Sequence, residues 1–203
     1  FTAWIRLPAS DGSGAICARM DDANGYRGWD FWTQRRQIGM HVVNAWPEKG
    51  LKVLAKEQVP ANECVHVAVS YDGSHKAAGI KVYYNGKPQE TNVENDKLAG
   101  PIDTDVPFKI GQRNSSAQLT GGLQDLRIFR RALSAADVSA LANTSRLAGL
   151  LKTAEGKLDA LAASEFWDFW LTTFEDAFTA SSRQLADLER EQNEIQARGT
   201  IAH

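Results

Sequence analysis

The first two-thirds of the chain consist of short runs in which apolar and polar residues alternate. The clearest is Val65–Tyr71, in which every second residue is large and apolar. A period of two predicts a strand with one buried face. The next run, Ile80–Tyr84, ends at Asn85-Gly86, a dipeptide typical of two-residue hairpin turns. These strands predict an antiparallel meander, which favours a β-sandwich or jelly roll over a wound α/β enzyme.

Strand-like runs recur at short intervals up to Phe129, and Gly, Asn, Asp or Pro stands in the gaps between them. Short strands separated by turn residues are the pattern of an all-β sandwich. The predicted strands are Phe1–Leu7, Gly14–Arg19, Trp29–Thr33, Gln37–Asn44, Lys52–Lys56, Val65–Tyr71, Ile80–Tyr84, Phe108–Gln112 and Gly122–Phe129.

Beyond Ser134 the composition changes, because Gly and Pro become scarce while Ala, Leu, Glu and Gln dominate. Ser134 and Asp137 form a capping-box pattern that predicts the start of a short helix. Further on, Trp167 begins a series of mostly apolar positions at alternating spacings of four and three, which indicates coiled-coil packing. We expect a turn near Ala162–Ser164 and an antiparallel helical hairpin whose second arm, Glu165–Arg198, is the longer.

Length and charge exclude several classes of partner. With 203 residues, the chain can bury a full core and carry one further element. Its formal net charge of −2 creates no basic field, so nucleic acid is not an expected partner. No apolar run approaches the ~20 residues of a membrane span. Because Phe1 opens a strand pattern without an initiator Met or signal peptide, we expect an internal piece of a larger protein.

Cys17 and Cys64 are the two cysteines of the chain. No CxxC or other ligand spacing accompanies them, so a zinc site is not expected. Both lie in apolar, strand-like surroundings, which favours two buried free thiols. A single disulfide between them, suited to an oxidising compartment, is the alternative.

Several ordered segments together resemble a laminin-G/pentraxin-type domain of the concanavalin A-like lectin/glucanase superfamily. They are FTAWIRL (Phe1–Leu7), CVHVAVSYDG (Cys64–Gly73), IKVYYNGKP (Ile80–Pro88), IGQ (Ile110–Gln112) and GGLQDLRIFRRAL (Gly121–Leu133). The resemblance covers residues 1–142 and implies two antiparallel sheets in a jelly roll, with a helical hairpin or linker at 143–203. It also implies that the family's first strand is missing here.

A finer resemblance lies in Gly39–Lys56, GMHVVNAWPEKGLKVLAK. It is similar to the version of this domain found in large exported planctomycete proteins that also contain a c-type cytochrome module. This implies an exported protein, at the cell surface or in the periplasm, whose helical tail leads to neighbouring domains. The aromatic cluster around Trp167 and Trp170 is too apolar for water, so we expect another part of the chain or of its parent to cover it.

The sequence shows no pattern for catalysis. Glycosidases need two carboxylates about 5–10 Å apart, and no predicted strand carries such a set. No HExxH pattern, phosphate loop or nucleophile elbow occurs either. The chain is therefore interpreted as non-catalytic, with an unrecognised hydrolase as a remote alternative.

A calcium site is also not expected. Pentraxin-like domains follow the Ile-Gly-Gln segment with an acidic, oxygen-rich triplet, whereas Arg113–Ser115 stands at that place here. Arginine is a poor neighbour for Ca²⁺. The one acidic loop that could hold a cation contains Asp21, Asp22 and Asn24. We therefore expect no cofactor.

Sugar binding requires an aromatic platform and polar groups that contact hydroxyls. On the strand Trp29–Thr33, Trp32 is out of phase with Trp29 and Phe31, so Trp32 is the aromatic expected on the outer face. For each tryptophan, packing in the core is the favoured interpretation, and Trp32 is the one most expected to be exposed. The candidate ligand-binding residues are Tyr26, Trp32, Arg35, His41, Asn44 and Trp46.

These observations lead to two main hypotheses for function. The first is a non-enzymatic recognition domain that binds a glycan or polysaccharide. The second is a structural or protein-interaction module that spaces and docks the neighbouring domains of a larger protein. The fold alone does not decide between them.

Overall fold

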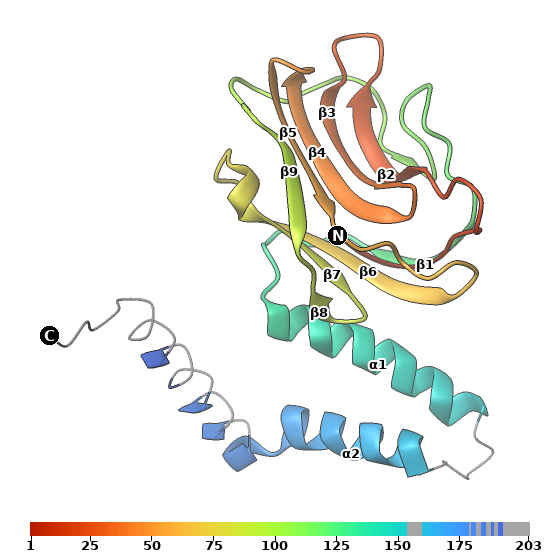
Figure 1. Cartoon of the computed structure of the whole chain (residues 1–203), viewed down its shortest axis with the longest axis vertical. Helices are drawn as coiled ribbons and strands as arrows, with labels where there is room; N and C mark the ends of the chain where they lie inside the picture. Colours follow the sequence, from red (N-terminus) through yellow and green to blue (C-terminus); the bar gives the residue numbers. More distant parts are fainter. Residues whose placement is uncertain (154–159, 179, 182–183, 186–187, 189–190, 193–203) are drawn as a thin grey trace, which may run out of the picture. The chain divides into compact units, whose positions relative to one another are not determined.

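The computed structural model describes residues 1–153, 160–178, 180–181, 184–185, 188 and 191–192. The chain divides into two compact units, Phe1–Ala142 and Asn143–His203. The first unit contains two antiparallel sheets, seen as stacked layers in Figure 1. The antiparallel sandwich predicted from the alternation is therefore confirmed.

Within the fully described first unit, one sheet has five strands in the order β11-β1-β6-β7-β8, and the other has six in the order β10-β2-β3-β4-β5-β9. The five-stranded sheet contains β1 Thr2–Arg6, β6 Cys64–Tyr71, β7 Ile80–Tyr84, β8 Lys87–Pro88 and β11 Gly122–Arg127. The six-stranded sheet contains β2 Gly14–Asp21, β3 Arg27–Gln34, β4 Gln37–Ala45, β5 Lys49–Ala55, β9 Thr91–Asp96 and β10 Lys109–Ile110. A short 3₁₀ helix, Ala77–Gly79, precedes β7.

The core lies between the two sheets. The alternating valines of β6 face it, as the period of two predicts. From the six-stranded sheet, Phe31 contributes the largest fully buried side chain. Burying a side chain of this kind stabilises the fold by roughly 1.5–3 kcal/mol. Phe1 packs on Trp29 with ring centroids 4.7 Å apart, so the start of the chain also covers this core.

The turns agree with the residues that form them. Asn85 and Gly86 have φ values of 47° and 80°, and they connect β7 to β8 as a two-residue hairpin loop. This left-handed conformation is the one that Asn-Gly tolerates best. The predicted hairpin is therefore confirmed.

The predicted capping box is confirmed at the start of helix α1, Ala135–Thr153. The Asp137 backbone N–H donates to Ser134 Oγ at 3.1 Å, and the Ser134 N–H donates to the Asp137 carboxylate at 2.9 Å. Arg131 donates to both oxygens of that carboxylate, at 2.7 and 2.9 Å. Such contacts satisfy groups that a helix start otherwise leaves unpaired. The helix is longer than the short one expected.

The start of α1 also buries the outer face of β6 and β7. Leu133 and Val138 pack with Ala68 and Tyr83, which point away from the core between the sheets. Ser70 Oγ donates to the Leu133 carbonyl at 2.9 Å. As a result β6 is buried on both faces, whereas its alternation predicted one buried face.

Two predictions about the helical region differ from the structure or lie beyond it. The prediction of a turn near Ala162–Ser164 is wrong, because helix α2 runs without interruption over Ala160–Phe174. Ala and Leu favour helix there, and no Gly or Pro interrupts it. The predicted arm Glu165–Arg198 extends beyond the described residues. Of the helices that the structure describes, none combines the length and apolar character needed to cross a membrane.

The sequence missed the edge strand β9. Its residues are mostly exposed and polar, so the sequence pattern of Glu94–Asp96 predicts a loop. The strand forms because its backbone pairs with β5, from Leu51↔Asp96 to Ala55↔Thr91. At the other edge of the sandwich, β1 lies beside β11, the first and last strands of this unit. The resemblance to the family implies a further strand before β1 that is missing here, and this stays a prediction.

Both thiols are free. Cys17 is buried in the core, and this burial raises the pKa of its thiol to about 12. Cys64 is exposed, so the prediction of two buried thiols is wrong for this residue. Cys64 is the first residue of β6 and pairs with Arg6, the last residue of β1, outside the apolar cluster that Leu133 and Val138 form with Ala68 and Tyr83.

The hydroxyl of Tyr84 connects three parts of the sandwich. It accepts a hydrogen bond from the buried Ile38 N–H at 3.0 Å and donates one to the Glu57 carbonyl at 2.9 Å. We predict that Tyr84→Phe lowers the free energy of unfolding by about 1–3 kcal/mol, because a buried donor loses its partner. Urea denaturation measures this. Tyr83→Phe is the control, since the Tyr83 hydroxyl has no hydrogen bond to a described residue; equal losses would contradict the assignment.

Candidate functional site

The outer face of the six-stranded sheet carries a set of aromatic and charged side chains. Phe31 of β3 faces the core, so its neighbours Asp30 and Trp32 face away from it. The register then places Asp30 opposite His41 on β4, and His41 opposite Lys52 on β5. Three adjacent strands thus present charged and aromatic side chains side by side.

These side chains line a hollow of about 290 Å³, which we call the aromatic pocket. This volume is close to the lower end of the range for small-molecule sites. The pocket is lined by Met20, Tyr26, Trp32, His41, Val43, Trp46, Lys52 and Arg113.

A row of rings forms one wall of the aromatic pocket. The ring centroids of Trp32 and His41 are 4.4 Å apart, and those of His41 and Trp46 are 5.5 Å apart in an edge-on arrangement. Lys52 Nζ lies 5.2 Å from the Trp32 ring centroid. The ammonium group is also paired with Glu94 at 2.7 Å, which fixes the lysine over the ring.

Beneath the pocket, Asp30 is fully buried and pairs with two partners. Its Oδ1 lies 2.8 Å from His41 Nδ1 and accepts the His41 backbone N–H at 3.1 Å. Its Oδ2 accepts from Arg113 Nε and pairs with Arg113 Nη2, both at 2.7 Å. Burial opposes ionisation of this carboxyl, but the attraction and hydrogen bonds of His41 and Arg113 outweigh it and hold the pKa of Asp30 below its ordinary value.

This pairing orients the guanidinium of Arg113 between two rings. Its Cζ lies 5.5 Å from the Tyr26 ring centroid and 5.1 Å from that of Trp32. A guanidinium held by one carboxylate still has N–H groups that can donate to a ligand. Tyr26 has φ of 58°, a backbone conformation that bulky residues seldom adopt, so the surrounding loop imposes its position.

The acidic loop predicted as a weak calcium candidate holds the Arg113 loop in place. The Asp22 carboxylate accepts from the Ser115 N–H at 2.8 Å and from the hydroxyls of Ser115 and Ser116. Burial opposes its ionisation, but these hydrogen bonds and Arg113 lower the pKa of Asp22. Asp21 accepts from the Ala23 N–H at 3.2 Å. Within the described part of the chain, no group of three His, Cys, Asp or Glu residues could hold a metal ion.

Comparison with known proteins supports this architecture. The family described as the concanavalin A-like lectin/glucanases superfamily matches residues 1–139. The chain belongs to this superfamily. No curated protein matches the chain.

Two solved structures share the fold of this concanavalin A-like domain. One is the carbohydrate-binding module CBM40 of the Ruminococcus gnavus IT-sialidase, bound to α2,3-sialyllactose, with a TM-score of 0.53 and 17% identity over 70% of this chain and 80% of that chain. The other is the binding domain of Paraclostridial Mosquitocidal Protein 1, with a TM-score of 0.51 and 20% identity. That match covers 71% of this chain and only 36% of the toxin domain.

The concanavalin A-like domain brings together four of the six predicted ligand-binding residues. Tyr26, Trp32, His41 and Trp46 all line the aromatic pocket. Trp29, in contrast, packs against the core between the sheets. The expectation that Trp32 lies on the outer face is therefore confirmed, although its ring is half-buried.

The other two predicted residues lie elsewhere. Asn44 is buried, and its Nδ2 donates to the Pro101 carbonyl at 2.5 Å. A bulge between Val43 and Ala45 turns the strand there. Arg35 lies in the β3–β4 turn and lines a different hollow.

Sequence reasoning missed Lys52 and Arg113 as pocket residues. Lys52 could have been found from its place in β5, where it alternates with the core residues Leu51 and Val53. Arg113 offered no such signal, because 83 positions separate it from Asp30 along the chain.

The ion pairs of Asp30 predict a pH-dependent contribution to stability. Asp30→Ala is expected to lower the free energy of unfolding at pH 7 by about 3–5 kcal/mol, because Arg113 loses its buried counter-charge and His41 loses its hydrogen-bond partner. Since the folded-state pKa is lowered, this stabilisation is present above the ordinary Asp pKa near 4 and is lost as pH falls through the folded-state value.

Urea denaturation at several pH values tests this prediction. The difference between wild type and Asp30→Ala should narrow at acid pH, while the exposed control Asp105→Ala should differ little from wild type at any pH. A pH-independent difference for Asp30→Ala would contradict the role of the charged carboxylate.

Proposed function

We propose that the concanavalin A-like domain is a non-enzymatic recognition domain that binds carbohydrate in the aromatic pocket. The observation that supports it most is the combination of rings and cations in one small hollow. The apolar C–H faces of a sugar can pack on Trp32 and Trp46, while Arg113 and Lys52 can donate to its hydroxyls. Recognition of carbohydrate by CBM40, which shares the fold, agrees with this proposal.

The charges of the pocket favour binding over hydrolysis. Glycoside hydrolysis uses two carboxyl groups on either side of the scissile bond. The residues lining the aromatic pocket include no Asp or Glu. The carboxylate beneath them, Asp30, is buried and held ionised by its partners, so it is a poor proton donor.

We place this domain in an exported parent protein, on the resemblance of Gly39–Lys56 to planctomycete proteins that carry a c-type cytochrome module. In that setting the domain would attach the parent to a cell-surface or environmental polysaccharide. No cofactor is required, because the contacts proposed for the sugar come from side chains of the pocket.

A glycan array, run with and without calcium, tests whether the domain binds carbohydrate at all. For a glycan that binds, Trp46→Ala is expected to weaken affinity about tenfold or more, as for truncation of a central aromatic contact. Titration calorimetry measures the change. Trp4→Ala is the matched control, because Trp4 is also half-buried but belongs to the five-stranded sheet.

Circular dichroism must show that both variants fold. A silent array under both conditions, or loss of binding in Trp4→Ala with Trp46→Ala unaffected, would contradict the proposed site.

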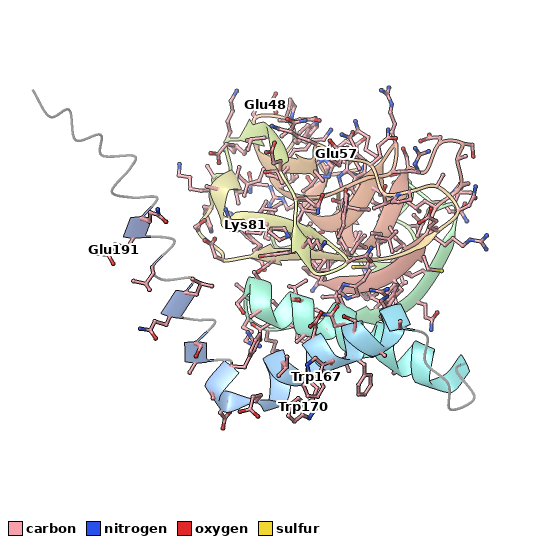
Figure 2. All side chains as sticks on the ribbon, turned by 60° about the horizontal axis from the view of Figure 1, so that its bottom comes forward. Glu48, Glu57, Lys81, Trp167, Trp170 and Glu191 are labelled. Carbon is pink, nitrogen blue, oxygen red and sulfur yellow. The ribbon has the colours of Figure 1, made fainter. Side chains whose placement is uncertain are left out.

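A second function, docking of neighbouring domains, is supported by helix α2. Trp167 and Trp170 stack with ring centroids 5.1 Å apart, yet they are 58% and 38% exposed. Figure 2 shows both rings on the same side of the helix. We propose that this apolar face contacts another part of the parent protein, because exposed tryptophan pairs are unfavourable in water.

This exposure can be measured on the isolated chain. An environment-sensitive apolar dye such as ANS should bind to the tryptophan pair, and the double variant Trp167→Ser, Trp170→Ser should lose most of that fluorescence. Unchanged dye fluorescence in the double variant would show that the pair is already covered.

A further inference from the structure

A second hollow, of about 430 Å³, lies at the β3–β4 turn. We call it the turn hollow. Segments that precede β2 and follow β5 complete it, and its side chains are mainly hydroxyl, amide and charged groups. It is lined by Ala9, Ser10, Asp11, Ser13, Gln34, Arg35, Arg36 and Gln58.

The turn hollow adjoins the aromatic pocket. Gln34 follows Trp32 by two positions on β3, so both side chains lie on the outer face. Lys52 Nζ, which lines the aromatic pocket, donates to Gln34 Oε1, which lines the turn hollow, at 3.1 Å. One hydrogen bond therefore links the walls of the two hollows.

The turn itself contains two arginines in an unfavourable conformation. Gln34 pairs with Gln37, so Arg35 and Arg36 form a two-residue hairpin loop with φ of 50° and 63°. Asn and Gly are the residues preferred there, and other residues adopt this conformation only at an energetic cost. Strain of this kind is concentrated at functional sites.

Contacts within the fold account for the guanidinium of only one of the two turn arginines. Arg36 donates to the carbonyls of Val59 and Ala9, at 3.2 and 3.0 Å, and to Gln58 Oε1 at 2.7 Å. Arg35 is exposed, and its guanidinium makes no hydrogen bond or ion pair with a described residue. It is thus available to a ligand.

The charges of the two hollows differ in how they are balanced. In the aromatic pocket, Arg113 is paired with Asp30 and Lys52 with Glu94. In the turn hollow, neither arginine has a carboxylate partner in the described part of the chain, and Asp11 is the single acidic residue of the lining. The excess positive charge therefore lies in the turn hollow.

We infer that the turn hollow is a second subsite, which binds an anionic group of an oligosaccharide whose neighbouring unit occupies the aromatic pocket. The inference rests on the proposed carbohydrate function and narrows its ligand to an acidic oligosaccharide. Arg35 and the fixed Arg36 bind the carboxylate or sulfate with charge-assisted hydrogen bonds. Ser10 and Gln34 contact adjacent hydroxyls.

Three probes of equal length test the inference by titration calorimetry: a neutral oligosaccharide, an oligouronate and a sulfated oligosaccharide. Wild type is expected to bind an anionic probe more tightly than the neutral one, with an advantage that shrinks at high salt. Arg35→Gln is expected to lower affinity for that anionic probe about three- to tenfold and to leave the neutral probe unchanged. The preferred anionic probe shows whether the group is a carboxylate or a sulfate.

Lys81→Gln is the matched control, because Lys81 is an exposed cation on β7 of the other sheet (Figure 2). Equal weakening by Lys81→Gln would reveal a general charge effect and overturn the subsite. Arg35→Gln could bind all probes with wild-type affinity while Trp46→Ala no longer binds them. That result would support carbohydrate binding in the aromatic pocket and overturn the proposed second subsite. Absence of binding by wild type to every probe would overturn both proposals.

Discussion

The buried carboxylate of Asp30 is the interaction on which the outer face of the six-stranded sheet depends. It contacts His41 on the next strand and Arg113 in a loop distant in sequence, so it joins three segments of the domain. Without Asp30, the guanidinium of Arg113 would lose its counter-charge and the buried His41 would lose a hydrogen-bond partner. With Asp30 in place, the imidazole lies between the rings of Trp32 and Trp46, and the guanidinium lies between the rings of Tyr26 and Trp32.

The two sheets differ in how their outer faces are covered. Val138 at the start of α1 and Leu133 just before the helix cover part of the five-stranded sheet and complete a second apolar cluster. On the six-stranded sheet, the corresponding face keeps an open hollow lined by rings and cations. A sandwich whose one outer face is packed and whose other is open is well suited to present a binding surface on a rigid support.

Local rules account for much of the fold and for part of the site. Alternation along β3 predicts that Trp32 faces outward, and the structure places it there. Arg35 and Asn44 are close to pocket residues in sequence, but a turn and a bulge direct them elsewhere. Arg113 could not be placed, because its contact with Asp30 depends on how distant loops meet across the sheet. The same holds for β9, whose polar residues form a strand only through pairing with β5.

The most direct test of the carbohydrate site is an NMR titration that follows the indole N–H signals of the six tryptophans. With a glycan selected by an array, the signals of Trp32 and Trp46 should shift most, and those of Trp4 and Trp29 should stay nearly unchanged. Shifts confined to Trp167 and Trp170, or to Trp4, would place binding outside the aromatic pocket and contradict the account.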